Sequence, residues 1–262
     1  NADPYTAVLL VNKDSSNTYT GTVMRETGDY RFLEGAVIQN KLYLSMFNGN
    51  QAYYFSAEIA DDALVNGEYL SGNHYRATWE GVVDSTYFPP DPTKMARLKD
   101  GVERIDFSLP NQNGEVMTWE DMNYDGKVVV IEITGSWCPN CLDAKRAIHR
   151  LFEEFDADEV AFLPINFEIS DSLSRVLPSI LRMQRATGGE MPFLFGGKAT
   201  RENVKTALPM LEGFRAYPTL IFVDKQGKVA RIYTGFYGPG TGAHYDNFMR
   251  DTHELLKRLV DA

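Results

Sequence analysis

The stretch of residues 127–141 reads K-V-V-V-I-E-I-T-G-S-W-C-P-N-C. Its first part, up to Thr134, is short, apolar and rich in β-branched residues, which predicts a buried strand. Its last part holds Cys138 and Cys141, the only 2 cysteines of the 262 residues. Beyond them, apolar residues recur at the spacing of one helix face: Cys141, Ala144, Ile148, Leu151, Phe152 and Phe155. The residues therefore predict a strand, a tight turn and a helix that begins at the cysteine pair.

Cys138 is placed at the amino terminus of this predicted helix. Pro139 suits the first helical turn, where the N–H that proline lacks would have no intrahelical partner. The unpaired N–H groups and the helix dipole favour negative charge there, so the Cys138 thiol loses its proton more easily. A thiolate attacks a disulfide, and a second cysteine one turn later can attack the resulting mixed disulfide. We therefore predict that Cys138 is the attacking cysteine and Cys141 the resolving one.

The cysteine pair has two alternative roles, a zinc half-site and a stabilising disulfide. A structural zinc site takes four ligands, and no histidine lies at ligand spacing from the pair or from another histidine. The four histidines are His74, His149, His244 and His253. A disulfide that closes so short a loop contributes little loop-closure entropy. Redox chemistry is the prediction that remains, with no metal site and no cofactor.

The composition argues against several classes of protein. A chain of 262 residues is long enough for two domains, and 44% apolar with 24% charged residues is ordinary for a globular protein. The formal charge of −10 argues against nucleic acid as a partner, because a nucleic-acid binder neutralises phosphates with clustered lysines and arginines. No apolar run approaches the roughly 18 residues that a membrane-spanning helix needs. We therefore predict neither nucleic-acid binding nor a membrane span.

Residues 1–88 are predicted to form an antiparallel all-β domain, a meander or partial barrel of seven or eight strands. Asn-Gly pairs between β-rich runs, as at Asn48-Gly49, are strong hairpin signals, and Asn66-Gly67 is predicted to separate two further strands. Aromatic residues in these strands either line a groove or serve packing, and packing is their commoner role in sheets. They are Tyr43, Phe47, Tyr53, Tyr54, Phe55, Tyr69, Tyr75 and Trp79. The role of this domain stays open.

Residues 89–104 are predicted to be a linker, because closely spaced prolines cannot hold a sheet ladder or a long helix. The second domain, residues 105–262, begins with a hairpin before the strand–turn–helix unit. An insertion at about 170–211 combines helical spacing with a short strand and a helix capped by Thr200. This insertion either forms one wall of a substrate groove or serves packing. A closing hairpin and a final helix complete the domain.

Three motifs of the second domain resemble a known family. They are S-W-C-P-N-C at 136–141, Ala216-Tyr217-Pro218-Thr219 before a strand, and the turn Asp224-Lys225-Gln226-Gly227-Lys228. From about Ile105 to the carboxyl terminus the chain resembles thioredoxin-fold proteins of the TlpA-like or redoxin type, which are bacterial thiol-disulfide oxidoreductases. The resemblance implies an α/β thioredoxin-like fold behind the all-β domain. It also implies a cis Tyr217–Pro218 bond, which places the Tyr217 backbone beside Cys138 to pair with a substrate strand.

The same resemblance assigns further site residues. Trp137, Pro139, Tyr217 and Pro218 are expected to bind substrate. Glu132 is expected to lie beneath the cysteine pair and to take up the proton of Cys141. A carboxyl group in an apolar strand has its pKa raised by desolvation, which suits a proton acceptor near neutral pH. The alternative is that Glu132 lies at a strand edge and reaches water.

The predicted activity is reduction of protein disulfides, with an upstream thioredoxin-like protein as electron donor. Strong oxidants of this fold carry a histidine between the cysteines, whereas Pro139 and Asn140 are neutral and stabilise a thiolate less. Lys145 and Arg146 are predicted to lie too far along the helix to compensate through solvent. The alternatives are a disulfide oxidase or isomerase, and a metal carrier or partner-binding protein that is not an enzyme. Copper-handling relatives use a wider Cys-x-x-x-Cys pair with a histidine, and peroxidases of the family use a proline-threonine-cysteine arrangement that Thr134 does not match.

The first residue is Asn1 rather than methionine. A removed signal peptide is one cause of such a start. Together with the family resemblance, it leads us to expect a periplasmic or exported envelope protein.

Overall fold

The structure is a computed structural model that describes residues 5–49, 51–189 and 191–262, so that Asn1 lies outside it. The chain divides into two compact units. The first, called the β unit below, runs up to Pro89 and also takes in Tyr237–Tyr245. The second, called the redox unit, comprises Pro90–Phe236 and Asp246–Ala262.

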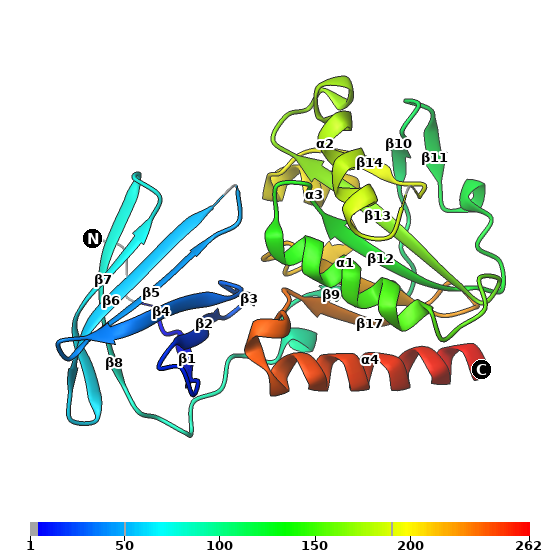
Figure 1. Ribbon diagram of the computed structural model, residues 1–262. Coiled ribbons are helices and arrows are strands. Elements are labelled where there is room, and N and C mark those ends of the chain that lie inside the picture. Colours follow the sequence, from blue (N-terminus) through cyan, green and yellow to red (C-terminus); the bar gives the residue numbers. More distant parts are fainter. Residues whose placement is uncertain (1–4, 50, 190) are drawn as a thin grey trace. The chain divides into compact units, whose positions relative to one another are not determined.

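The β unit is one antiparallel sheet in the order β1-β2-β4-β5-β6-β7-β8, with β3 paired to β2 (Figure 1). The strands are β1 (Val8–Lys13), β2 (Tyr19–Arg25), β3 (Gly28–Asp29), β4 (Leu33–Ile38), β5 (Lys41–Phe47), β6 (Ala52–Ala60), β7 (Ala63–Ser71) and β8 (Tyr75–Val82). The predicted all-β class of this region is confirmed. Asn66-Gly67 differs from the prediction, because it forms a bulge inside β7 rather than a turn between strands. Asn66 has φ 51°, a backbone angle that a bulge needs as much as a turn does.

Aromatic side chains make up much of the core of the β unit. Phe55 and Tyr69 are buried and their rings stack at 4.6 Å, while Tyr30 stacks on Tyr69 at 5.7 Å. Tyr53 and Trp79 pack partly buried against the same cluster. Packing is therefore the role of Phe55, Tyr69 and Trp79, whereas Phe47 and Tyr75 are exposed.

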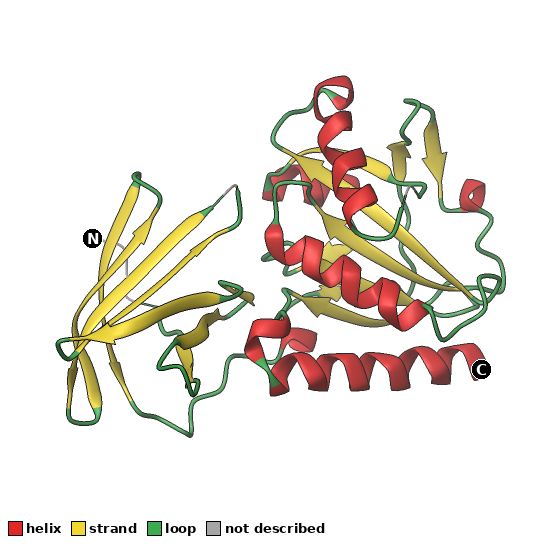
Figure 2. Cartoon of the chain, viewed as in Figure 1, coloured by secondary structure: helices red, strands yellow, loops and turns green. Residues whose placement is uncertain are grey.

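The redox unit is built on a five-stranded mixed sheet in the order β14-β13-β12-β16-β17. Figure 2 shows its helices in red and its strands in yellow. Its strands are β12 (Val128–Thr134), β13 (Val160–Glu168), β14 (Leu194–Lys198), β16 (Thr219–Val223) and β17 (Val229–Thr234). β12 is central, parallel to β13 and antiparallel to β16, and each of its residues is buried. A continuous apolar run is what a strand covered on both faces requires.

Alternate residues of β12 face the two sides of the sheet. Ile131 and Ile133 belong to the main core together with Val204 of α3 (Arg201–Ala207). Glu132 and Thr134 face the other side, where α1 (Pro139–Phe152) lies. Two more helices are α2 (Leu173–Ala186) and α4 (Ala243–Asp261). This arrangement is the α/β thioredoxin-like architecture that the sequence predicts.

Short elements connect these parts. The segment predicted as a linker contains a 3-10 helix, η1 (Pro92–Lys94), capped by Asp91, and strand β9 (Arg97–Leu98), which pairs with β15 (Leu211–Glu212). The other short elements are β10 (Ser108–Pro110), β11 (Val116–Thr118), η2 (Glu120–Met122) and η3 (Pro239–Thr241). Among the described residues, no helix has the length and apolar character needed to cross a membrane.

Candidate active site

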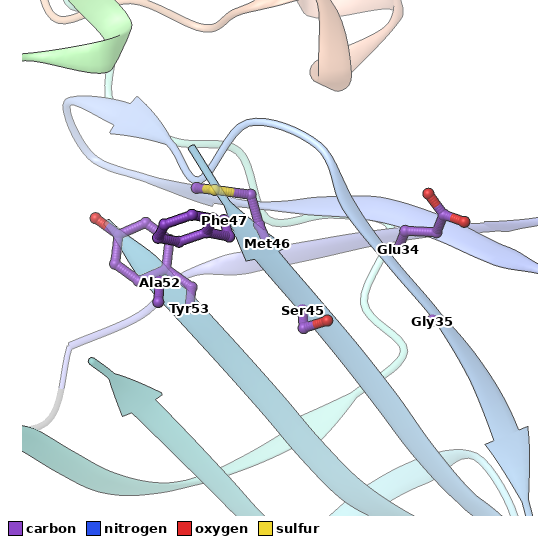
Figure 3. Close-up of a pocket in the computed structure, with 7 residues that line it drawn as sticks. All are labelled: Glu34, Gly35, Ser45, Met46, Phe47, Ala52 and Tyr53. Atoms are coloured by element: carbon purple, nitrogen blue, oxygen red, sulfur yellow. The ribbon is translucent and has the colours of Figure 1, made fainter. Parts of the chain in front are cut away.

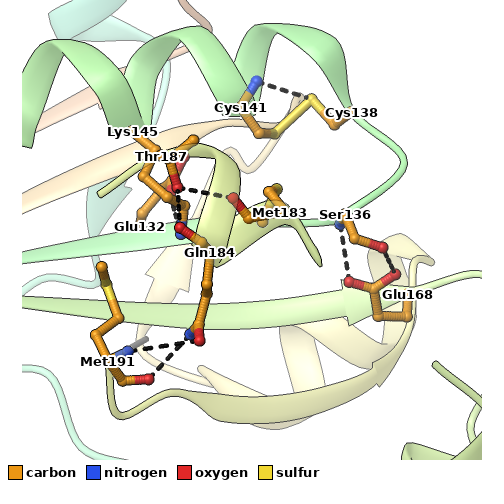
Figure 4. Close-up of polar contacts among 10 residues, drawn as sticks. All are labelled: Glu132, Ser136, Cys138, Cys141, Lys145, Glu168, Met183, Gln184, Thr187 and Met191. Atoms are coloured by element: carbon orange, nitrogen blue, oxygen red, sulfur yellow. Dashed lines mark hydrogen bonds and ion pairs between the residues drawn. A yellow bond between two sulfur atoms is a disulfide. The ribbon is translucent and has the colours of Figure 1, made fainter. Parts of the chain in front are cut away.

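Cys138 and Cys141 form a disulfide at the first turn of α1 (Figure 4). Cys138 is the N-cap residue of this helix, with extended backbone angles, and its Sγ accepts a hydrogen bond from the Cys141 N–H at 3.2 Å. Cys138 is 6% exposed and Cys141 is fully buried. Of the two cysteines, Cys138 is thus the one that keeps slight exposure to solvent and receives a helix N–H.

The loop before the disulfide is tied to the sheet. The Cys138 N–H donates to the Gly135 carbonyl at 3.0 Å, which closes a turn. The Trp137 indole N–H donates to the Phe167 carbonyl at the end of β13, at 2.9 Å. A Cβ atom at Gly135 would lie 2.6 Å from that carbonyl oxygen, so only glycine lets the loop approach β13 this closely.

The loop before β16 faces Cys138. The Tyr217–Pro218 peptide bond is cis, and the Tyr217 carbonyl oxygen lies 3.7 Å from Cys138 Sγ. The Trp137 and Tyr217 rings meet edge to face at 5.3 Å. Burial raises the pKa of Tyr217, so its ring is a neutral wall of the site. The loop comes close because β16 pairs with β12 directly ahead of the disulfide, with Thr219 opposite Ile133.

Glu132 does not lie at a sheet edge. It is fully buried in the central strand, between Pro164 of β13 and Leu220 of β16. Its carboxylate pairs with the ammonium group of Lys145 at 3.3 Å, and Lys145 is also fully buried (Figure 4). Burial raises the pKa of Glu132, while the Lys145 charge opposes that rise.

The position of Lys145 corrects the expectation that it lies too far off to influence the site. Lys145 follows Cys141 by four residues, so both side chains lie on the same buried face of α1. Its Nζ also lies 5.0 Å from the centre of the Phe162 ring, a cation–π contact. Burial and the nearby Lys145 charge lower the pKa of His149, one further turn along the helix. The Lys145 charge therefore lies in the protein interior, beside Glu132.

The site contains a second buried carboxylate, Glu168, which the sequence did not predict. Glu168, the last residue of β13, is 1% exposed and accepts two hydrogen bonds from Ser136 (Figure 4). Burial raises the pKa of Glu168, and the two bonds from Ser136 oppose that rise. No sequence pattern announces this contact, because the two residues are far apart in the chain.

The other titratable groups that the sequence singled out lie elsewhere. His253 pairs with Glu154 at 3.0 Å, and the His244 ring lies 6.0 Å from that of Tyr237. Within the described residues, no three His, Cys, Asp or Glu side chains are grouped so that they could hold a metal ion. The cysteine pair thus has no metal-ligating neighbours in the part of the chain that the structure describes.

A cavity of about 650 Å³ lies on the β unit, at strands β4 to β6 (Figure 3). Its lining residues are Glu34, Gly35, Ser45, Met46, Phe47, Ala52 and Tyr53. Phe47 is 75% exposed beside it, whereas burial raises the pKa of Tyr53 to about 12. The lining offers no activated nucleophile and no acid–base pair.

Known proteins resemble the redox unit. A model of the AhpC/TSA family matches residues 101–232, just over half of the chain. The thioredoxin-like protein YneN of Bacillus subtilis (strain 168) is 24% identical over 142 residues, which cover 54% of this chain and 75% of that protein. A secreted thiol-disulfide isomerase from Corynebacterium glutamicum is 21% identical, with a TM-score of 0.44, over 67% of this chain and 97% of that one.

A third relative is an exposed lipoprotein thioredoxin, Etrx1, from Streptococcus pneumoniae strain TIGR4. It is 24% identical, with a TM-score of 0.40, over 59% of this chain and 99% of that one. The family match confirms the resemblance to thioredoxin-fold redoxins that the motifs indicated.

Proposed function

Because the chain belongs to the AhpC/TSA family and its general chemistry is that of a thiol-disulfide oxidoreductase, we propose that it reduces protein disulfides through Cys138 and Cys141. The observation that carries the proposal is the placement of the pair. Cys138 is the N-cap residue of the helix, is slightly exposed, and accepts the Cys141 N–H on its sulfur; a fully buried Glu132 lies in the strand beneath the same helix. N-terminal helix N–H groups stabilise a thiolate, which is the attacking species.

The proposed reaction is two thiol–disulfide exchanges. The Cys138 thiolate attacks one sulfur of a substrate disulfide, forms a mixed disulfide and expels the other sulfur as a thiolate. Cys141 then gives up its proton and attacks the Cys138 sulfur. The first substrate cysteine leaves as a thiolate, and the Cys138–Cys141 disulfide forms. The substrate gains two electrons, the protein loses two, and a thiol-bearing donor protein restores the dithiol.

Glu132 is proposed to accept the proton of Cys141. Lys145 supports this role of Glu132, because its side chain extends from the Cys141 face of α1 to the Glu132 carboxylate in β12 (Figure 4). A raised pKa keeps Glu132 a better proton acceptor than an ordinary carboxylate, and the Lys145 charge keeps enough of it ionised to accept.

Substrate is proposed to lie against Trp137, Pro139, Tyr217 and Pro218. The Tyr217 backbone borders Cys138 and is available to pair with an extended substrate segment, as an added strand does. The partners are accordingly protein disulfides and an upstream thioredoxin-like donor. We further propose a periplasmic or exported location, and a division of the chain into a β domain at residues 1–88, a linker at 89–104 and a redox domain at 105–262.

Reduction of insulin disulfides by the dithiol-activated protein tests the proposal. Wild type is expected to precipitate insulin, and Cys138→Ser to be inert. Cys141→Ser is expected to accumulate a mixed disulfide on Cys138, because resolution lacks its nucleophile. Failure of the wild type to reduce insulin, with its disulfide shown to be reduced beforehand, would count against a general reductase. Labelling of Cys141 before Cys138 by iodoacetamide at neutral pH would reverse the two cysteine roles.

A further inference from the structure

We propose that Glu168 is a positioning residue for the redox pair, whose buried carboxylate holds Ser136 and thereby keeps Cys138 at the amino terminus of α1. This inference rests on the proposed function, since it concerns the reactivity of the same cysteine. Glu168 is 1% exposed. Carboxylates are seldom so deeply buried without a dedicated partner, because desolvation of the charge is costly.

The Glu168 carboxylate is held by Ser136, in the loop at residues 135–138, which we call the redox loop. The Ser136 N–H donates to one carboxylate oxygen at 2.8 Å, and the Ser136 hydroxyl donates to the other at 2.7 Å (Figure 4). Hydrogen bonds to an ionised acceptor are short and about twice as strong as neutral ones. Two such bonds to one residue fix both its position and its orientation, two residues ahead of Cys138.

Glu168 is itself fixed to the sheet. Its carbonyl accepts the Ala199 N–H at 2.7 Å, and it is paired in register with Lys198 of β14. Its side chain therefore links the middle of the redox unit to the loop. Among the described residues, these two hydrogen bonds to Glu168 are what connects Ser136 to the sheet.

The neighbouring loop residues converge on the same strand end. The Trp137 indole bonds the Phe167 carbonyl, and Gly135 leaves no room for a Cβ beside it. Three consecutive residues, Gly135 to Trp137, thus contact the last two residues of β13. Cys138 follows directly, and its sulfur needs the N-cap position to receive the Cys141 N–H.

Charged groups near Glu168 lie on α1, β12 and β14, and the last of these carries its register partner Lys198. Lys145 of α1 is the cation that acts on it, and Glu132 of β12 is the other carboxylate that shares this cation. Both oxygens of Glu168 already accept hydrogen bonds from Ser136. We therefore assign proton uptake from Cys141 to Glu132, and the contact with the loop to Glu168.

The test measures Cys138 itself and needs no protein substrate. The reduced protein is alkylated with iodoacetamide across pH 5 to 9, and its dithiol is equilibrated with glutathione. Glu168→Ala and Ser136→Ala are each expected to raise the apparent pKa of Cys138 and to slow its alkylation at pH 7, by about tenfold per unit of pKa. The double variant is expected to be no slower than Glu168→Ala, because Glu168→Ala already removes both hydrogen bonds and Ser136→Ala removes only the hydroxyl one of the same two.

Glu168→Gln separates the hydrogen bonds from the charge. A carboxamide can accept the Ser136 N–H and donate to its hydroxyl, so this variant should alkylate at nearly the wild-type rate. Asp171→Ala is the matched control, because Asp171 also accepts a backbone N–H, that of Lys198 at 2.7 Å, but holds β14 rather than the redox loop. It should leave the Cys138 profile unchanged.

Three results would overturn the proposal. One is an unchanged Cys138 profile in Glu168→Ala and Ser136→Ala. Another is additive slowing in the double variant. The last is faster alkylation in both Glu168→Gln and Glu168→Ala, which would mean that the negative charge matters and the position does not. Because insulin reduction by the wild type is scored separately, a failure here leaves the proposed function standing, and the reverse also holds.

Discussion

Lys145 decides what Glu132 is able to do. Alone in an apolar layer, the Glu132 carboxyl would stay protonated far above its ordinary pKa and would accept no further proton. The Lys145 ammonium, at 3.3 Å, opposes that rise and allows the ionised form. A proton acceptor beneath the redox pair therefore requires both residues. Glu132 lies in β12, where the sequence located the acceptor, whereas Lys145 lies in α1.

Glu132→Gln should slow the release of mixed disulfides by about a hundredfold, the low end of what a positioned acid–base group contributes. Because the pKa of Glu132 is raised, the wild-type release rate should increase as pH rises through that value and the carboxyl group loses its proton. The variant should lack this inflection and retain only that of the Cys141 thiol. Stopped-flow decay of a mixed disulfide from pH 5 to 9 measures both. Identical pH profiles would leave Glu132 without a catalytic role.

In α1, a buried ion pair links the helix to the central strand of the sheet. Its buried face presents Cys141, then Lys145 one turn later, then Ile148 in the apolar layer. The buried Glu132–Lys145 pair crosses from this helix to β12. Removing one partner of a buried pair leaves a charge without compensation, whereas removing both leaves none.

Lys145→Met should lower the free energy of unfolding by about 3–5 kcal/mol at pH 8. Since the folded pKa of Glu132 is raised, its contribution to stability is present below the unfolded value near 4.3 and is lost as pH rises through the folded one. The loss in Lys145→Met should therefore be smaller at pH 4.5 than at pH 8. Urea unfolding gives both values.

The double variant Glu132→Gln/Lys145→Met is the control for this prediction. It should recover most of the lost stability, because no unpaired charge remains. A double variant as unstable as Lys145→Met alone would show that packing of the long side chain matters and the ion pair does not.

The sequence predicted what is encoded locally. The apolar run of β12, the Pro139 start of α1 and the cysteine spacing each lie within a few residues, and the structure has all three. Asn66-Gly67 was predicted wrongly as a strand boundary because turns and bulges ask for the same backbone angles. The burial of Lys145 was missed because the buried face of α1 was predicted from its apolar residues alone. The spacing of Lys145 from Cys141 nevertheless places it on that face.

Contacts between distant residues were beyond the sequence. Glu168 and Ser136 are 32 residues apart, and their contact exists only because β13 runs parallel to β12 and ends beside the redox loop. The Tyr217 carbonyl reaches Cys138 for a similar reason, through the pairing of β16 with β12. Parallel and crossover pairings of this kind depend on the whole sheet.

At the scale of the whole molecule, the two units have separate cores. The core of the β unit contains Phe55 and Tyr69, and that of the redox unit contains Ile131 and Ile221. A change that weakens only the first core should therefore leave disulfide reduction intact.

Phe55→Ala should destabilise the β unit by about 3–5 kcal/mol, the usual cost of removing a buried ring. Hydrogen exchange should show lost protection in β5 to β7 and preserved protection in β12, with insulin reduction at the wild-type rate. Phe55→Leu is the matched control and should lose less. A parallel fall in insulin reduction would show that the β unit contributes to the activity.

The direction of electron flow depends on how well the whole site stabilises the Cys138 thiolate. Pro139 has no N–H to offer, and the Asn140 amide donates to the Phe236 carbonyl at 3.3 Å. The Tyr217 carbonyl, 3.7 Å from Cys138 Sγ, favours the thiol over the thiolate in the reduced protein. Lys145 is engaged by Glu132. These contacts favour a pair that gives up its electrons readily.

The reduction potential of the Cys138–Cys141 disulfide distinguishes a reductase from an oxidant. It is obtained by equilibrating the full chain with glutathione or dithiothreitol buffers and titrating the fraction reduced. We expect a midpoint nearer that of thioredoxin, about −270 mV, than that of the strong oxidant DsbA, about −120 mV. A midpoint above about −160 mV would contradict the reductase assignment and would favour disulfide formation or isomerisation instead.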